Sequence, residues 1–321
     1  MADPGRAAAR AEFSFAERVA ACDVCGAAAF SSVDAEANVV SCDACGYRFV
    51  NPRPSQSEIA AAYSDPHFYD GWIADDTGRH EMWRKRLTLV RQHTRTPGPD
   101  LRPDSRQGSR PGLAHGTRLL DVGAGIGAFL AMAREQGWTV AGTEVSTSAR
   151  NLARERYGLD LLFGQAEDLS LPSQAFDVVT LWHVLEHVPS PARLLRACAQ
   201  ALVPGGFLVV AVPNDDDAAF FPNRVKRSIL GALGRHPAPR VRYERLRPGS
   251  EIHLSHFTLP VLRRLLTTTG FDVRWVSIDD HYTMPNVKTN VQVALYRTVR
   301  RVTGANMGQA MVLVAELHDG S

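Results

Sequence analysis

Short apolar runs alternate with amphipathic segments in the second half of the chain, a pattern typical of strands and helices that follow one another. The runs "FDVVTLW" and "FLVVAV" carry apolar side chains without polar alternation, so both faces of these strands are expected to be covered. Between the predicted strands, helices at 128–137 and 147–158 each end on a glycine. The pattern predicts an α/β fold with a doubly wound parallel sheet.

Two stretches interrupt this alternation. Residues 96–116 hold eight Gly or Pro in 21 positions and almost no bulky apolar side chains, which predicts a flexible linker. Residues 214–252 lack the alternation and are predicted to form an inserted cap. The helix and strand pattern resumes in "HLSHFTLPVLRRLLTTTGFDVRWVSI" and closes on "QAMVLVAEL" as a last strand. We therefore assign 117–321 to one α/β domain.

The part of the chain before the linker has a different pattern. Residues 1–20 are rich in alanine and arginine and predict a frayed lead-in, whereas residues 55–95 predict helices. This helical segment carries four closely spaced aromatic residues, Tyr63, Phe68, Tyr69 and Trp72. They either form a lid over a pocket or belong to the core.

Length and charge narrow the class of protein. At 321 residues, the chain fits one large domain with a smaller appendage. Its net charge of +2 argues against a protein that coats nucleic acid. The segment 223–250 nevertheless holds eight Arg or Lys against one acid, which either favours an anionic acceptor or marks a solvated surface loop.

The sequence shows neither a signal peptide nor a run of about 20 apolar residues, so we expect a soluble, cytoplasmic protein without membrane contact.

The cysteines indicate a metal site. Cys22, Cys25, Cys42 and Cys45 form two C-x-x-C-G units separated by 16 residues, a spacing that places four thiolates around one zinc ion. Four cysteine ligands leave no open position on the metal, so the predicted zinc ribbon at 21–54 has a structural role. Cys198 stands alone in a helical pattern and is expected to be a buried thiol.

The glycine turn in "LLDVGAGIGAFL" raises the question of its ligand. Gly123, Gly125 and Ala128 fit the dinucleotide fingerprint G-x-G-x-x-[GA]. A dinucleotide would place its phosphates at the start of the following helix, where the carboxylate of Asp121 would repel them. S-adenosylmethionine has no phosphate and carries an ammonium and a sulfonium group, so Asp121 favours it. Glu144 follows at the end of the next strand, where it can accept both ribose hydroxyls of either ligand.

Four motifs in order, over about residues 117–215, carry a resemblance to a known family. They are "LLDVGAGIGAFL", the acid Glu144, "FGQAEDLSLPSQAFDVVTLWHVLEHVPSPARLL" and "ALVPGGFLVVAVPN". Together they resemble the class I S-adenosylmethionine-dependent methyltransferases, in the small-molecule branch that includes quinone-biosynthesis enzymes. The two C-x-x-C-G units and the segment that follows them, "FVNPRPSQSEIAAAYSDPHFYD", further resemble those of bacterial members with an N-terminal zinc ribbon. Several of these members act in natural-product tailoring. The resemblance implies a seven-stranded Rossmann-like sheet.

The resemblance also implies a set of cofactor-binding residues. Those at the methionine end are Asp121, Gly123, Ala124 and Gly125. Glu144 binds the ribose, with Val145 beside it among the cofactor contacts. The adenine contacts are Gln165, Ala166 and Glu167, where Gln165 replaces an aspartate that the family often has. Trp182 and His183 would line the methionine and acceptor side.

Histidines are the candidate general bases for an acceptor hydroxyl. His183 stands at the end of the fourth predicted strand, and we interpret His187 as a structural partner of Glu186 or of the sheet edge. The segment "HVLEH" matches the zinc-protease signature H-x-x-E-H, but its place after a strand of a nucleotide-binding sheet argues against that activity. His253 and His256 fall in a predicted loop, where they either reach the acceptor or serve packing.

His281 and Tyr282, further along the chain, are weaker candidates of the same kind.

The sequence therefore predicts transfer of a methyl group from S-adenosylmethionine to a small, possibly anionic molecule, at oxygen, in a bacterial specialised pathway. The alternatives are a zinc-ribbon RNA methyltransferase, a sugar C- or N-methyltransferase, and a scaffold that has lost activity. The near-neutral charge and "LWHVLEH" in place of an Asn-Pro-Pro-Tyr-like motif disfavour the RNA enzyme. The identity of the acceptor and the oligomeric state stay open.

Overall fold

The computed structural model describes residues 12–63, 76–94, 116–216, 243–279, 287–304 and 306–318. Several sequence predictions lie outside these residues. They are the start of the lead-in, the aromatic residues Phe68, Tyr69 and Trp72, nearly all of the linker, most of the cap, and His281 and Tyr282. In the part of the chain that is described, no helix is long and apolar enough to cross a membrane.

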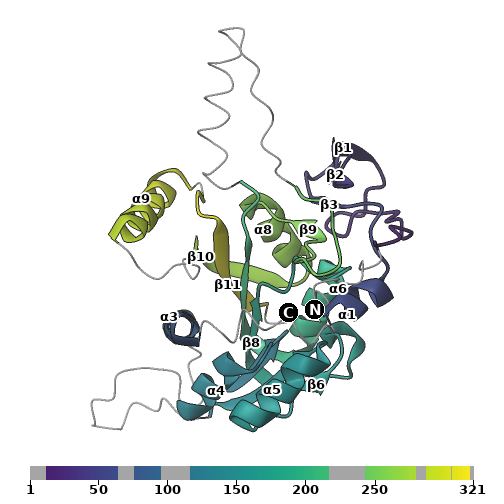
Figure 1. Ribbon diagram of the computed structural model, residues 1–321. Coiled ribbons are helices and arrows are strands. Elements are labelled where there is room, and N and C mark those ends of the chain that lie inside the picture. Colours follow the sequence, from purple (N-terminus) through teal and green to yellow (C-terminus); the bar gives the residue numbers. More distant parts are fainter. Residues whose placement is uncertain are drawn as a thin grey trace, which may run out of the picture.

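The predicted α/β sheet is present and has seven strands (Figure 1). Its strands are β4 (Arg118–Val122), β5 (Thr139–Glu144), β6 (Leu162–Phe163), β7 (Phe176–Trp182), β8 (Leu202–Pro213), β10 (Phe271–Ile278) and β11 (Ala310–Leu317). Across the sheet they follow the order β6-β5-β4-β7-β8-β11-β10. The strand order reverses beside β4, and ligands of open α/β sheets bind at such a switch point.

One strand departs from the predicted parallel sheet. β11 runs antiparallel to both of its neighbours, with Leu313 opposite Val210 of β8 and Val276 of β10. The predicted doubly wound sheet is thus parallel except at this strand. A strand buried on both faces reads as a continuous apolar run in either direction, so "AMVLVA" could not reveal its orientation.

Helices cover both faces of the sheet. The helices of the described residues are α1 (Gln56–Tyr63), α3 (Asp76–His93), α4 (Ala128–Glu135), α5 (Thr147–Tyr157), α6 (Pro191–Ala201), α8 (Leu259–Thr268) and α9 (Val287–Thr303), with a 3₁₀ turn η2 (Ala166–Asp168). Of these, α1 packs in a separate cluster with Phe13 and Val50 rather than on the sheet. Apolar side chains of α6 and α8 pack into one core, and those of α3 and α4 pack into another. Two cores on one sheet are what a doubly wound fold requires.

Local sequence fixes the ends of the helices beside the site. Ser146 begins α5 by accepting a hydrogen bond from Ala149 N–H, and Gly158 ends that helix with φ +61°. Ser190 begins α6, where Pro191 occupies the first turn. These capping residues set where each helix starts relative to the strand before it.

The cysteine pairs belong to a second, smaller sheet, and we call residues 21–54 the cysteine ribbon. Its strands β1 (Phe30–Asp34), β2 (Val39–Cys42) and β3 (Arg48–Val50) pair in that order, and a fourth strand, β9 (Ser255–His256), pairs with β3. The sequence predicted a loop at 255–256, which was wrong. Two residues are too short a run to show strand periodicity, and their partner lies about 200 positions away.

The described part of the predicted lead-in is packed rather than frayed. Phe13 is 7% exposed and shares a cluster with Ile59 and Tyr243. Glu17 pairs through its backbone and side chain with Arg53. The alanine-rich composition of residues 1–20 gave no indication that Phe13 and Glu17 make these contacts.

Candidate active site

A cavity of about 350 Å³ opens at the carboxyl ends of β4, β5 and β7. The structure brings every predicted cofactor residue to its wall. These are Asp121, Gly123, Ala124, Gly125, Glu144, Val145, Gln165, Ala166, Glu167, Trp182 and His183. Residues of α1 and α3 close the cavity from the other side. The roles of these residues stay predictions, but their common location agrees with one ligand that spans several strand ends.

The glycine turn lets the backbone approach the cavity wall. Gly123 has φ +68°, and a Cβ atom there would lie 2.6 Å from Cγ2 of Val184. The chain then enters α4 through Gly127, which has φ +79°. Both positions therefore need a residue without a side chain.

We expect Gly123→Ala to destabilise the protein by more than backbone strain alone. Left-handed backbone costs alanine about 1–2 kcal/mol, and the contact with Val184 adds to that cost. Gly158→Ala is the matched control, because Gly158 has φ +61° with nothing within 4 Å of the added Cβ. Urea unfolding of both variants measures the difference, and equal losses would contradict the close approach.

Asp121 lies at the end of β4 and is only 2% exposed. Its Oδ1 accepts a hydrogen bond from the Thr180 hydroxyl at 2.6 Å. Burial raises the pKa of Asp121 to about 7, and the nearby Glu144 carboxylate also raises it. The cavity thus holds a carboxylate that a cationic ligand would stabilise in its charged form.

Glu144 ends β5 and is fixed by the backbone around it. Its two oxygens accept hydrogen bonds from Gly125 N–H and Ser146 N–H, both at 2.8 Å. Burial raises the pKa of this carboxyl, while the backbone donors lower it. Each carboxylate oxygen has a second lone pair, so a bound diol can donate to Glu144 without displacing the backbone.

Arg86 of α3 is a cavity residue that the sequence did not reveal. It is 5% exposed, its Nη2 donates to Asp279 Oδ2 at 2.8 Å, and its guanidinium lies 4.6 Å from the centre of the Trp182 ring. Within the described residues, Arg86 Nε and Trp182 Nε1 are buried donors without a partner. The run "WRKRL" gives no sign of which arginine faces inward, because that depends on how α3 packs.

His183 follows β7 in a left-handed backbone conformation, with φ +56°. Its Nδ1 lies 3.2 Å from Glu186 Oε1, and its Nε2 lies 3.2 Å from Asp279 Oδ2. Although burial opposes a charge, these two carboxylates raise the pKa of His183 to about 9. An imidazolium with both nitrogens engaged does not accept a proton at neutral pH, so the geometry disfavours the predicted role of His183 as a base.

Two more histidines meet in the wall of the cavity. The rings of His187 and His253 are 4.9 Å apart, edge to face. One nitrogen of each ring and one oxygen of Glu186 lie within 4.8 Å of one another. His253 also lies 3.5 Å from a Glu251 oxygen, and both residues line the cavity. His253 thus lies in the cavity wall, and its contact with the acceptor stays a prediction.

His256 lies elsewhere. Its backbone pairs with Arg48 in the cysteine ribbon, and its ring packs against Tyr243 with centroids 4.6 Å apart. Of the two histidines in "HLSHFT", only His253 is among the residues that line the cavity described here. His253 precedes β9 and His256 lies within it, so the two histidines of this motif have different surroundings.

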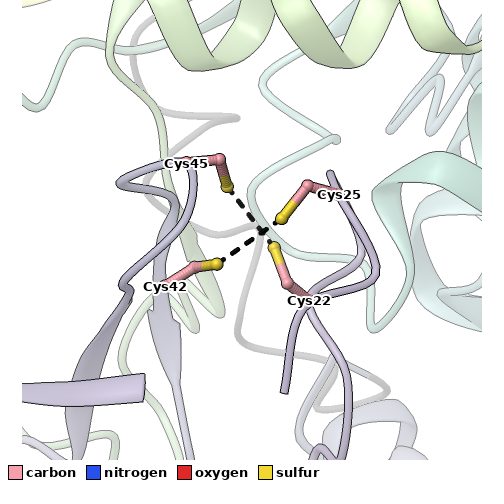
Figure 2. A group of neighbouring side chains, drawn as sticks. All are labelled: Cys22, Cys25, Cys42 and Cys45. Carbon is pink, nitrogen blue, oxygen red and sulfur yellow. Dashed lines mark hydrogen bonds between the residues drawn. The ribbon is translucent and has the colours of Figure 1, made fainter. Parts of the chain in front are cut away.

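The four ribbon cysteines converge on one point (Figure 2). Cys22 Sγ lies 3.6 Å from Cys45 Sγ, and Cys25 Sγ lies 3.5 Å from Cys42 Sγ. These distances exclude disulfides, whose sulfurs are about 2.05 Å apart. Four sulfurs at about 2.3 Å from a zinc ion in a tetrahedron are separated by about 3.8 Å. The cluster therefore has nearly the geometry that a tetrahedral metal requires.

Comparison with known proteins finds relatives of the α/β part of the chain. A family model described as "Methyltransferase domain" matches residues 79–275. A ubiquinone biosynthesis O-methyltransferase from Paracidovorax citrulli is 33% identical over 159 residues, covering 46% of this chain and 65% of that protein. One from Caulobacter sp. is 33% identical over 166 residues, covering 49% and 60%. The chain thus spans less than two thirds of the length of these curated relatives.

A solved structure also matches part of this chain at low sequence identity. An S-adenosylmethionine-dependent methyltransferase from Methanosarcina mazei has a TM-score of 0.45 and 18% identity. The match covers 65% of this chain and 95% of that one.

Proposed function

This chain belongs to the methyltransferase-domain family, and from that premise we propose that it transfers a methyl group from S-adenosylmethionine to a hydroxyl group of a small molecule. The observation that carries the proposal is the charge pattern of the cavity. One buried carboxylate, Asp121, stands where a dinucleotide would place its phosphates, and a second, Glu144, stands where either ligand would place its ribose. A ligand without phosphates, with one cationic end and a diol, suits that pattern.

The unpartnered groups of the cavity fit the same ligand. Arg86 Nε and Trp182 Nε1 are buried donors that have no partner among the described residues, and they suit the carboxylate at the methionine end. Asp121 suits the ammonium, and Glu144 suits the ribose hydroxyls. When bound, S-adenosylmethionine supplies a methyl group on a sulfonium, so the protein contributes alignment and exclusion of water rather than a reactive group of its own.

Methylation at oxygen is supported by the acceptor side of the cavity and by the relatives. Apolar residues such as Ile59 and Val188 line it together with Tyr63, His187 and His253, so a base for a hydroxyl proton is at hand. The curated relatives are named as ubiquinone biosynthesis O-methyltransferases. The cysteine ribbon instead favours the predicted specialised pathway.

We propose that the cysteine ribbon holds zinc in a structural role. Its four sulfurs fill a tetrahedral site and leave no position for a substrate. The ribbon also packs into the main core, since Cys22, Cys42 and Tyr47 share a cluster with Leu195 of α6. Zinc there supports the fold beside the cavity.

Two measurements test the proposed function: the binding of S-adenosylmethionine and the mass of the methylated product. Isothermal titration calorimetry of the full chain is expected to show binding of S-adenosylmethionine. Incubation with the trideuteromethyl cofactor and a panel of phenols, sugars and short RNAs is expected to add one labelled methyl group to a hydroxyl compound. A folded protein that binds no S-adenosylmethionine would overturn the proposal, and labelling of RNA alone, lost at moderate salt, would favour the RNA enzyme.

We expect Arg86→Lys to weaken S-adenosylmethionine binding about tenfold, since a charged hydrogen bond contributes about 1.5–3 kcal/mol. Lysine keeps the charge near Asp279 but lacks the Nε–H donor and the planar group that stacks on Trp182. Arg84→Lys is the matched control on the same helix, because Arg84 is exposed and pairs with Glu81. Calorimetry on both variants checks the difference, and equal affinities would count against this cofactor contact.

A further inference from the structure

Glu186 presents a buried oxygen that the described residues do not satisfy. The side chain is 1% exposed and lines the cavity. Its Oε1 lies near His183 and His187, whereas its Oε2 has no hydrogen-bond partner in the described part of the chain. A buried carboxylate oxygen is a strong acceptor, and leaving it unpaired is costly. A hydrogen-bond donor of a molecule bound in the cavity would satisfy this oxygen.

The protonation of His187 follows from its neighbours. Its Nδ1 lies 2.8 Å from the carbonyl oxygen of Ile252 and 2.8 Å from the Tyr63 hydroxyl. A carbonyl only accepts, so Nδ1 carries a proton. In the neutral ring Nε2 then keeps its lone pair, and it lies 3.8 Å from Glu186 Oε1. Nε2 is thus an acceptor that faces another acceptor.

We propose that the acceptor molecule binds at His187 Nε2 and Glu186 Oε2. His187 is the general base, and Glu186 accepts a hydrogen bond from a second donor group of the acceptor. The inference rests on the proposed methyl transfer and deepens it. The hydroxyl that is methylated gives its proton to His187 Nε2. Its oxygen forms the new bond to the methyl carbon, while the carbon–sulfur bond breaks and leaves its electron pair on sulfur. A donor on the neighbouring atom of the acceptor binds Glu186 Oε2.

The charged groups around His187 suit this role. Burial and the nearby His253 lower the pKa of His187, and the carboxylates of Glu186 and Glu251 oppose that change. Tyr63 faces the ring from α1. The ring is therefore neutral before the reaction, and Glu186 stabilises the imidazolium that proton transfer creates.

The other histidines are less suited. Both ring nitrogens of His183 already face carboxylates. His253 pairs with Glu251, and its side chain is one third exposed. The sequence predicts only a structural role for His187. The carbonyl that its Nδ1 faces belongs to Ile252, which lies 65 positions away, so the local sequence does not reveal this contact.

The test uses 4-nitrocatechol, which carries two adjacent hydroxyls and changes its visible spectrum when it loses a proton. The full-length, metal-loaded protein with S-adenosylhomocysteine is titrated at a pH below the first ionisation of the free probe. We expect the bound probe to show its ionised spectrum. His187→Gln, whose amide can still donate to Ile252, is expected to bind the probe in its neutral form. Glu186→Gln is expected to weaken 4-nitrocatechol about tenfold and to leave 4-nitrophenol, with one hydroxyl, unchanged.

Controls distinguish a failure of the His187 base assignment from a failure of the proposed function, and from ionisation of the probe by a bound metal ion. His256→Gln lies outside the cavity and is expected to behave as wild type. Binding of S-adenosylmethionine by each variant reports folding, and its absence in wild type would instead overturn the proposed function. An ionised spectrum retained in His187→Gln would overturn the base assignment. So would a spectrum that changes only when Mg²⁺ is added to protein passed through metal-free buffer.

Discussion

Asp121→Asn is expected to reduce affinity for S-adenosylmethionine on the order of 100-fold, while the ligand-free protein becomes more stable. The loss of affinity follows because the cationic end of the ligand loses its buried charged partner, a contact worth about 2–3 kcal/mol. Asparagine still accepts the hydrogen bond from Thr180, so the local packing is kept.

The gain in stability has a defined pH window. The pKa of Asp121 rises from 3.8 in the unfolded chain to about 7 in the fold, mainly through burial. A carboxyl with a raised pKa destabilises the fold increasingly as pH rises from 3.8 to about 7, after which the cost stays level. The asparagine variant avoids that cost, so its advantage in thermal unfolding is expected to be largest above pH 7 and to shrink in acid.

The same titration predicts a pH-dependent affinity in the wild type. Below pH 7 the ligand must displace a proton from Asp121, so affinity is expected to fall about tenfold per pH unit. Calorimetry at pH 6 and pH 8 measures this change, and Asp160→Asn, at an exposed position, is the control. An affinity that does not vary between these pH values would contradict the role of Asp121.

Removal of the ribbon metal is expected to destabilise the entire fold rather than a separate appendage. Structural zinc contributes about 10–16 kcal/mol to small zinc domains, which matches or exceeds the stability of a typical protein. Here Cys22 and Cys42 belong to the same core as Leu194 and Leu195 of α6. The Tyr47 hydroxyl also lies 2.5 Å from that of Ser255.

Cys42→Ser is therefore expected to lower the unfolding temperature by at least about 10 °C in one cooperative transition. Cys198→Ser is the matched control, because Cys198 is a buried free thiol outside the cluster. It is expected to keep its zinc and to lose only a few degrees. Calorimetric unfolding with a zinc-release assay checks both variants. A first transition confined to the ribbon, with S-adenosylmethionine binding intact, would show that the ribbon is independent.

The parts of the site that the sequence predicted depend on short-range spacing. Asp121, the glycines after it and Glu144 lie on one strand–turn–helix–strand unit, so their geometry follows from local structure. The four cysteine sulfurs likewise lie together, and their spacing in the sequence predicts this without information on the rest of the fold.

The parts that the sequence missed depend on distant packing. Arg86 reaches Asp279 across 193 positions, and β9 joins the ribbon across about 200. His183 looked like a base from its place at a strand end. Only the positions of Asp279 and Glu186 show that both of its nitrogens are engaged.

The pairing of β3 with β9 also bears on the order in which the chain folds. The ribbon cysteines leave the ribosome early, but the sheet that contains them is complete only when Ser255 and His256 have been synthesised. Until then Tyr47 lacks its partners Ser255 and Phe257, and one edge of β3 stays open. Because contacts of such long sequence separation form late, the first structural unit of the chain to be made is among the last to be finished.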